Sequence, residues 1–415
     1  MTRLYTFELK KIFQKKAFWV TLIIGLIFNA LIVSANLLFD TYEYPDGSKV
    51  PAVEFFKKEA VECGKLSGRV IDDAFINEVR SKVIDCALDK KYVTEQDIAD
   101  IKSGKIKESF VAENGTGYTT PLVGLDDAAE QLGLSNAWYF MMDVMDDNAK
   151  LLTTDGEGFQ KAFRENVEIP KNNKAYWRAE ADKRPSPVAY IYDHPLLFLL
   201  DSGFFFDWFI FILIAVTLSG SFADERSTRM DALIQSAKRG KSPVAVAKLL
   251  AGFTVSIVST ILVYAITILT CRIDYGKINM DAPLQMLFAD SPHSMTMGDA
   301  IIKQFICTLV MSLLFTAVTV FLSQIMSSTA AMGIQTGILM VSFLNVPLKN
   351  PLLQNLWNLR PTHYMNGWLD NFSIFNIGSL ELNSIQMANI LYVIGALIFS
   401  TIAIILYKSC QVKSR

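Results

Sequence analysis

Few residues in the chain have the types and spacing that enzyme chemistry requires. The histidines, His194, His293 and His363, stand far apart, and no His-x-x-x-His or Cys-x-x-Cys pair is present to hold a catalytic zinc ion. No Gly-x-Ser-x-Gly turn is present to carry a serine nucleophile. Asp193 and His194 could form an acid–base pair, and a simple loop contact is the alternative interpretation. The sequence therefore predicts neither a catalytic site nor a metal site.

The tripeptide Gly240-Lys241-Ser242 matches the end of a phosphate-binding loop. The full motif needs a second glycine five positions earlier, where Gln235 stands, and an apolar strand in front of it. Neither is present. We therefore expect no cofactor in this chain, and any ATP and Mg²⁺ to be bound by another subunit.

The composition indicates a membrane protein rather than a cytosolic enzyme or a nucleic-acid-binding protein. Hydrophobic residues make up 51% of the 415 residues and charged residues only 19%. A membrane-spanning helix needs about 20 mostly apolar residues. Six stretches approach or meet that length: 18–39, 204–222, 249–271, 301–326, 329–344 and 388–407.

The charges divide between two environments. Residues 40–203 contain 30 acidic and 20 basic side chains, whereas the rest of the chain contains 11 acidic and 19 basic. Fourteen of those 19 lie in residues 1–17, 223–248 and 408–415, which six crossings place on one side. Because short cytosolic segments are enriched in Lys and Arg, this predicts a multi-pass protein of the cell membrane with cytosolic termini and residues 40–203 outside.

The predicted fold is mainly α: six transmembrane helices plus an extracytoplasmic, mostly helical domain. Apolar spacing predicts outer-domain helices over 53–66 and 70–88, and Thr94-x-x-Asp97 resembles a capping box that opens a helix closed near Gly104. Between the six helices lie an amphipathic helix (1–17), the outer domain (40–203), a cytosolic loop (223–248), an outer loop (272–300), an outer hairpin (345–387) and a tail (408–415).

Cys63 and Cys86 are the only cysteines of the predicted outer domain. An oxidising exterior favours a disulfide between them, joining two successive helices. Two unpaired buried thiols are the alternative.

The cytosolic loop has the features of a docking element. Met230, Leu233 and Ile234 stand at i, i+3 and i+4 and would share one face of a short helix. Ser242-Pro243 is a typical helix start. A short charged helix here suits a groove on a soluble partner, and a helix held on anionic lipid is the alternative.

This loop resembles that of permease subunits in the ABC-2 family of ATP-binding-cassette transporters, which have the type V exporter fold. The family pattern is matched at Glu225, Thr228, Leu233, Ser236, Arg239 and Lys248, and Ser227 stands where glycine is usual. The resemblance extends to the helix order of the whole chain. A large insertion after the first membrane helix recurs in one branch of the family.

The resemblance implies roles for several segments. Residues 1–17 would be a connecting helix along the inner leaflet, and 345–387 a re-entrant outer hairpin. The loop would seat on a cytosolic ATPase, with a second permease completing a homo- or heterodimer in membrane lipid. The residues expected to couple the chain to the ATPase are Glu225, Arg226, Arg229, Leu233 and Arg239.

Two further sites are expected from residue type and position. Gly25 and Asn29, together with Gly333 and Gly337, offer small or polar faces for a dimer seam. Phe206, Asp207 and Trp208 lie near the predicted outer interface and could form a gate.

The function expected from the sequence is that of an exporter permease, which moves an amphipathic peptide, drug or lipid-like substrate outward and is powered by a separate ATPase. The alternative is a membrane-anchored sensor whose outer domain binds a ligand and whose basic loop recruits a partner.

Overall fold

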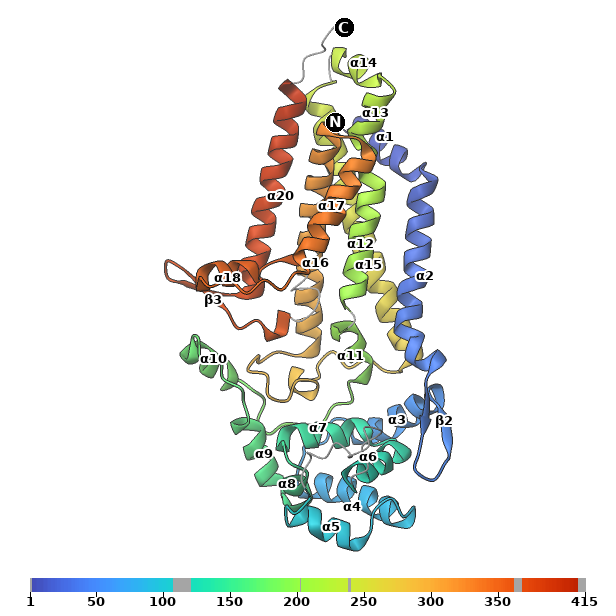
Figure 1. Cartoon of the computed structure of the whole chain (residues 1–415), viewed down its shortest axis with the longest axis vertical. Helices are drawn as coiled ribbons and strands as arrows, with labels where there is room; N and C mark the ends of the chain where they lie inside the picture. Colours follow the sequence, from blue (N-terminus) through green and yellow to red (C-terminus); the bar gives the residue numbers. More distant parts are fainter. Residues whose placement is uncertain (1, 107–120, 202, 238–239, 362–367, 410–415) are drawn as a thin grey trace. The chain divides into compact units, whose positions relative to one another are not determined.

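The structure of the chain is a computed structural model that describes residues 2–106, 121–201, 203–237, 240–361 and 368–409. It is mostly helical (Figure 1). The chain divides into two compact units. Unit 1 comprises Met1–Ile32, Leu200–Ile268 and Ile302–Arg415, and unit 2 comprises Val33–Leu199 and Leu269–Ile301.

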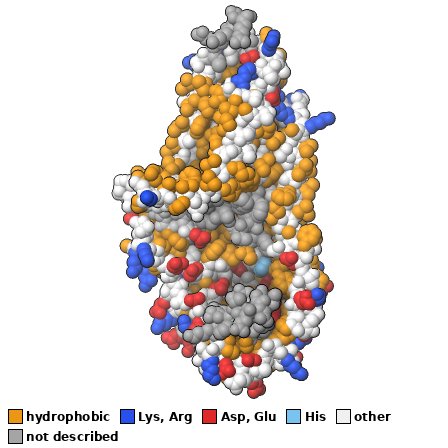
Figure 2. Space-filling model, in the orientation of Figure 1, with side chains coloured by type: hydrophobic (Ala, Val, Ile, Leu, Met, Phe, Trp, Pro, Cys, Tyr) orange, Lys and Arg blue, Asp and Glu red, His pale blue; other side chains and the backbone are white. Residues whose placement is uncertain are grey.

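Within the described residues, five helical stretches are long and apolar enough to cross a membrane. They are helix α2 (Lys16–Phe39), the stretch Asp207–Ser227, α15 (Ser242–Asp274), α16 (Met297–Ile325) and α20 (Ser384–Ser409). Figure 2 shows hydrophobic side chains over much of the surface of the unit 1 helices. Apolar side chains that are exposed along whole helices are typical of a surface in contact with lipid rather than with water.

The fifth expected span, 329–344, forms helix α17 (Ser328–Ser342), which has 15 residues. That is shorter than the ~20 residues needed to cross the hydrocarbon layer. Its start is fixed by Ser327, whose side chain accepts a hydrogen bond from the Ala330 N–H. Gln335 of α17 accepts a hydrogen bond from Thr319 of α16 at 2.7 Å, so its polar group is satisfied by a neighbouring helix.

The second expected span, 204–222, is a helix with a break after Leu218. It consists of α12 (Gly203–Leu218) and α13 (Gly220–Ser227), and the chain then turns into the short helix α14 (Met230–Ser236). The turn is made at Arg229, whose φ of 58° lies in the left-handed region. Helix α15 begins at Ser242 with Pro243 in its first turn, as the sequence predicted.

The expected outer hairpin, 345–387, contains several short elements. Helix α18 (Pro351–Trp357) is capped by Asn350, and strands β3 (Ile374–Ile377) and β4 (Leu380–Asn383) form an antiparallel hairpin that leads into α20. Unit 1 also contains helix α1 (Thr2–Phe13), at the start of the chain.

Unit 2 is a helical domain with a small β-hairpin, β1 (Thr41–Glu43) with β2 (Lys49–Pro51). Its core is filled by large apolar side chains that are fully buried, among them Phe75, Trp138, Phe159 and Trp177. The helices are α3 (Ala52–Leu66), α4 (Asp73–Asp89), α5 (Glu95–Lys102), α6 (Pro121–Leu132), α7 (Ser135–Met145), α8 (Asn148–Thr153), α9 (Gly156–Glu165), α10 (Lys174–Ala181) and α11 (His194–Asp201), the last of which extends past the unit's boundary.

The structure confirms the expected starts and ends of the early unit 2 helices. Thr94 and Asp97 form a reciprocal capping box, and Gly104 follows α5 with a φ of +69°. Helices α3 and α4 occupy the two ranges that apolar spacing predicted.

Unit 2 also contains residues 269–301, which include the separate outer loop 272–300 expected from the sequence. The buried Arg184 guanidinium donates hydrogen bonds to the carbonyl oxygens of Ala289 (2.7 Å) and Ser291 (2.6 Å). Asn279 donates to the Tyr192 carbonyl oxygen at 2.7 Å. These bonds join the segment to the domain that precedes it by about a hundred residues in sequence.

The expected Cys63–Cys86 disulfide is absent, because both residues are free thiols. Cys63 is buried, and its thiol donates to the Gly133 carbonyl oxygen at 3.3 Å instead. Burial raises the pKa of this thiol to about 12, so it stays protonated and unreactive at neutral pH. The alternative interpretation, two unpaired buried thiols, is borne out in part, since both thiols are unpaired but Cys86 is only partly buried.

We expect Gly25→Ala to destabilise unit 1, because an added Cβ would overlap the ring of Phe209 on α12. Overpacking of this kind costs about 1–3 kcal/mol. Gly64→Ala is the control, because nothing lies within 4 Å of its added Cβ and Gly64, in helix α3, is not one of the glycines expected at a dimer seam. Thermal unfolding in detergent should show a lower midpoint for Gly25→Ala only, and equal midpoints would contradict the packing of α2 on α12.

Candidate functional site

A cluster of four charged side chains, of which all but Lys11 are buried, joins three helices of unit 1. Glu8 and Lys11 come from α1, Glu225 from α13 and Lys248 from α15. The two acidic and two basic groups balance each other. We call these four residues the charge cluster.

Lys248 is the centre of the charge cluster. Its side chain is 2% exposed, and its Nζ lies 2.8 Å from Glu8 Oε2 and 2.6 Å from Glu225 Oε1. The same ammonium group lies 5.2 Å from the centre of the Phe222 ring. A buried ammonium group needs such partners, because an isolated charge away from water is very costly.

Glu225 connects Lys11, the second cation of the charge cluster, to Lys248. Its Oε1 also accepts a hydrogen bond from Lys11 at 2.5 Å, whereas Oε2 is buried without a described partner. Burial lowers the pKa of Lys11, but the hydrogen bond and charge of Glu225 outweigh that effect, so its pKa is raised. Lys11 is therefore positively charged at any physiological pH.

Glu8 was missed as a site residue by the sequence reasoning. It is the only acidic residue among the first 17, and it shares one face of α1 with Leu4, Lys11 and Ile12. An acidic side chain on the apolar face of a helix was the available signal. Lys248 was recognised as part of the loop pattern but not as the partner of Glu225.

Arg226 attaches α13 to the end of α16. Its guanidinium donates hydrogen bonds to the carbonyl oxygens of Gln324 and Met326, and to that of Ser323 at 3.3 Å. Ser323 and Gln324 belong to the last turn of α16, and Met326 follows its last residue. The backbone carbonyls at this helix end lack helical partners, and the helix dipole favours a cation there. Arg226 thus attaches the loop to α16 although its side chain is exposed, and its expected part in coupling to an ATPase stays a prediction.

Helix α14 has one packed residue and two exposed apolar residues. Ile234 packs against a core cluster formed by Phe222, Val244, Ala245, Leu249, Val320 and Tyr407. Met230 and Leu233 are 49% and 67% exposed. The expected shared face is thus divided between the core and the surface. Arg229 is exposed at the N-terminus of α14, and Arg239 lies outside the described residues.

The expected gate residues occupy different surroundings. Asp207 is fully buried and accepts hydrogen bonds from Thr308 (2.7 Å), Gln304 (3.2 Å) and Tyr264 (3.4 Å). These partners belong to α15 and α16, so Asp207 joins three membrane helices. Trp208 packs instead against Phe343, with ring centres 5.2 Å apart. The side chain of Phe206 lies outside what the structure describes.

The four residues expected at a dimer seam divide into two pairs. Gly25 and Asn29 are buried, Gly25 against Phe209 of the same chain, so this pair is covered without a second subunit. Gly333 and Gly337 are exposed on α17 with no heavy atom within 4 Å of an added Cβ. Only the α17 pair therefore lies on an open surface.

Unit 2 contains a separate buried polar cluster around Glu59, which is 1% exposed. Ser135 and Tyr192 donate hydrogen bonds to Glu59, the latter at 3.2 Å, and His194 Nδ1 lies 3.3 Å from Glu59 Oε2. His194 thus contacts Glu59, although the sequence offered Asp193 as its acid–base partner. Burial lowers the pKa of His194 and the Glu59 charge opposes this, as expected for a buried imidazole.

Unit 2 also has an acidic pocket of about 620 Å³. Five carboxylates and one lysine line it: Asp143, Asp146, Glu165, Glu168, Asp290 and Lys150. The excess of negative charge would attract a cationic ligand. Among the described residues no group of His, Cys, Asp and Glu side chains has an arrangement that could hold a metal ion.

Comparisons with known proteins identify no relative of the chain. No protein-family model matches the chain, and no curated protein or solved structure is significantly similar to it. The site must therefore be interpreted from its own geometry.

We expect Lys248→Met to destabilise unit 1 strongly, because Glu8 loses its hydrogen-bonded cation and Glu225 loses one of two. Breaking a buried ion pair on one side typically costs about 3–5 kcal/mol. Lys15→Met is the control: Lys15 pairs with Asp224 at an exposed position, where such pairs contribute about 0–1 kcal/mol. Thermal unfolding in detergent measures both.

A double variant separates charge imbalance from lost packing. Adding Glu8→Gln to Lys248→Met removes the carboxylate that has lost its hydrogen-bonded cation and leaves Glu225 paired with Lys11, so it should recover a large part of the lost stability. Equal stability of Lys248→Met and Lys15→Met would contradict the burial of the charge cluster.

We expect the stability of unit 2 to depend on the ionisation of Asp193. Burial raises the pKa of this carboxyl from 3.8 to about 7; a hydrogen bond from Asn136 opposes the rise and the Glu59 charge adds to it. The folded state then keeps a proton that the unfolded state releases, so this contribution to stability is lost as pH rises from about 4 to about 7. Asp193→Asn should flatten that fall, measured as unfolding midpoints across the window. Parallel pH profiles for both proteins would show that Asp193 titrates normally.

Proposed function

We propose that the chain is a permease subunit of an ATP-binding-cassette exporter of the ABC-2 family. The observation that carries this proposal is the charge cluster, together with the exposed helix α14 next to it. A helix with exposed apolar residues, tied firmly to membrane helices, is the arrangement that a soluble motor subunit needs to move a membrane domain. The resemblance of the loop to the ABC-2 pattern supports the same conclusion.

The contacts of the loop provide a physical route for coupling. Force applied to α14 reaches the core cluster through Ile234, reaches α16 through Arg226, and reaches α1 and α15 through Glu225. Such contacts transmit displacement because packed helices shift as units rather than deform. ATP-driven closure of the motor would thus bias the permease between two states.

In this proposal the partner is a cytosolic ATPase that binds ATP and Mg²⁺, and Met230 and Leu233 supply the apolar contact. The distribution of Lys and Arg supports a protein of the cell membrane whose two termini are cytosolic and whose unit 2 lies outside. Helix α17 would complete the six-span plan by crossing together with residues that follow it. The open faces of Gly333 and Gly337 would form the seam with a second permease.

The substrate class in this proposal is an amphipathic molecule moved outward. Asp207 and Trp208 would belong to the outer part of its path, since both lie in the first turns of α12. Intramembrane carboxyl groups that face other helices commonly mark such paths.

A second candidate function is a sensor whose outer domain binds a ligand. The acidic pocket of unit 2 favours it, because a pocket of about 620 Å³ falls within the ~300–1,000 Å³ range of ligand sites. A sensor would recruit a partner through the same loop, but its partner need not hydrolyse ATP.

The decisive experiment is to purify the full chain from its native membrane and identify the proteins that co-purify. We expect a soluble ATPase with a complete phosphate-binding loop, and we expect Leu233→Asp to reduce its recovery about tenfold or more by placing a charge at the apolar contact. Leu380→Asp is a matched control, since Leu380 is 62% exposed against 67% for Leu233 but lies in the β3–β4 hairpin.

The sensor would be supported by capture of a partner that lacks a phosphate-binding loop. Equal recovery of the ATPase with both variants would exclude α14 as the docking helix. Neither variant alters the charge cluster, so a lost partner cannot be attributed to an unfolded unit 1.

A further inference from the structure

We propose that unit 1 binds one anionic phospholipid molecule, with an acyl chain held in the pocket between α1, α15 and α16 and its headgroup near Arg3. The pocket has a volume of about 560 Å³. This proposal is independent of the transport function, because it requires neither an ATPase nor a substrate.

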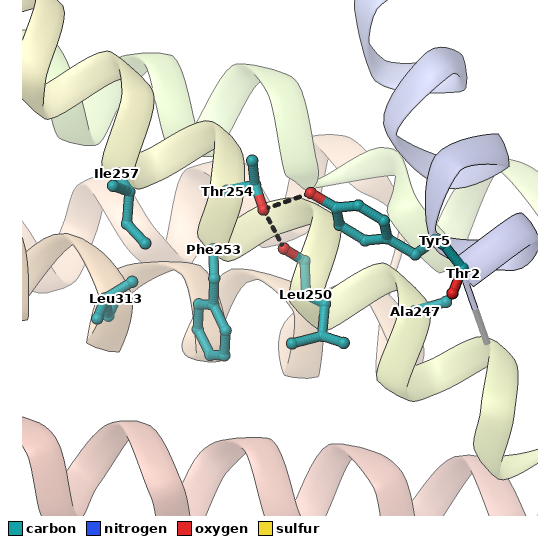
Figure 3. Close-up of a pocket in the computed structure, with 8 residues that line it drawn as sticks. All are labelled: Thr2, Tyr5, Ala247, Leu250, Phe253, Thr254, Ile257 and Leu313. Atoms are coloured by element: carbon teal, nitrogen blue, oxygen red, sulfur yellow. Dashed lines mark hydrogen bonds between the residues drawn. The ribbon is translucent and has the colours of Figure 1, made fainter.

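The lining of the pocket is apolar. Leu250, Phe253 and Ile257 come from α15, Leu313 from α16 and Tyr5 from α1 (Figure 3). The volume lies within the ~300–1,000 Å³ range of specific ligand sites. A hydrocarbon chain gains from such a wall by leaving contact with water or with disordered lipid.

The hydroxyl groups of Tyr5 and Thr254 in the pocket lining already form hydrogen bonds within the protein. Tyr5 OH and Thr254 Oγ1 lie 2.9 Å apart, and Thr254 Oγ1 donates to the Leu250 carbonyl oxygen at 2.9 Å (Figure 3). A polar ligand would have to break these bonds or leave its own groups unpaired. The pocket therefore favours the apolar part of a ligand. Thr2 of α1 is a polar residue of its lining.

The pocket continues onto a surface that faces lipid. Helix α15 is a candidate membrane span. Beside the pocket, four of its apolar side chains are 38–49% exposed: Leu250, Val258, Ile261 and Leu262. An acyl chain can therefore enter from the bilayer without crossing water.

The charge on α1 selects the headgroup. Arg3, Phe7 and Lys10 stand at i, i+4 and i+7 on one exposed face, and Phe7 is 61% exposed. Among the described residues, neither Arg3 nor Lys10 has a carboxylate within salt-bridge distance. Cations beside an exposed aromatic ring on an amphipathic helix are suited to anionic headgroups at the membrane surface. Arg3, next to Thr2, lies closest in sequence to the pocket.

Native mass spectrometry of the full chain tests this proposal. The protein is released from nanodiscs that contain phosphatidylglycerol and phosphatidylcholine with identical acyl chains. We expect one phosphatidylglycerol retained per chain, and about tenfold less for Ile257→Trp and for Leu313→Trp, which fill the pocket from two different helices.

Ile261→Trp is the matched control, because Ile261 is an exposed isoleucine one turn along α15 that does not line the pocket. It should retain lipid as the unaltered protein does. Arg3→Gln should still retain one lipid but lose the preference for phosphatidylglycerol.

Three results would overturn the proposal: no lipid retained by the unaltered protein, equal retention in Ile257→Trp and Ile261→Trp, or loss of a second protein copy rather than lipid in the pocket variants. The last would identify the pocket as a contact between two chains. An unchanged headgroup preference in Arg3→Gln would exclude the assigned headgroup position. Lipid retention is measured without ATPase or transport, so its failure leaves the proposed function to its own test.

Discussion

The arrangement of unit 1 depends on one ammonium group that is removed from water. Lys248 is buried between Glu8 and Glu225, and its charge is tolerable only while both carboxylates stay in place. Helices α1, α13 and α15 are therefore held together by a requirement for charge balance, in addition to apolar contact. The partners of a buried ion pair must stay within hydrogen-bond distance of each other, so the pair limits the register of the helices that carry it.

That constraint determines what the loop after α12 can do. Glu225 and Arg226 are next to each other in sequence, yet one bonds to α1 and α15 and the other caps α16. The loop is thereby attached at two points, and Ile234 adds a third through the core cluster. The large apolar side chains that helix α14 exposes are Met230 and Leu233, a small apolar surface on a firmly attached helix. This combination of a rigid base and an exposed apolar contact underlies the proposed coupling role.

Local signals in the sequence were reliable where one short segment decides the outcome. Thr94 and Asp97 predicted the start of α5, and Ser242-Pro243 predicted the start of α15, because a cap is completed by residues three or fewer apart. Predictions that needed two distant segments were less successful. Cys63 bonds to the Gly133 carbonyl rather than to Cys86, and Gly25 packs on Phe209 of its own chain. A cysteine or a glycine in the sequence indicates that a close contact is possible at that position. It does not indicate which residue the contact is made with.

The sequence by itself determined that this is a helical protein with several membrane-spanning helices, and that the residues around Glu225 form a charged loop between two of them. Apolar length and residue periodicity are local properties, so they can be read without the fold. Only the tertiary structure decided that Glu8 and Glu225 both pair with Lys248, 240 positions from Glu8, and that residues 269–301 belong with unit 2. Such pairings follow from the simultaneous satisfaction of buried charges and backbone groups across the whole fold, which no single segment encodes.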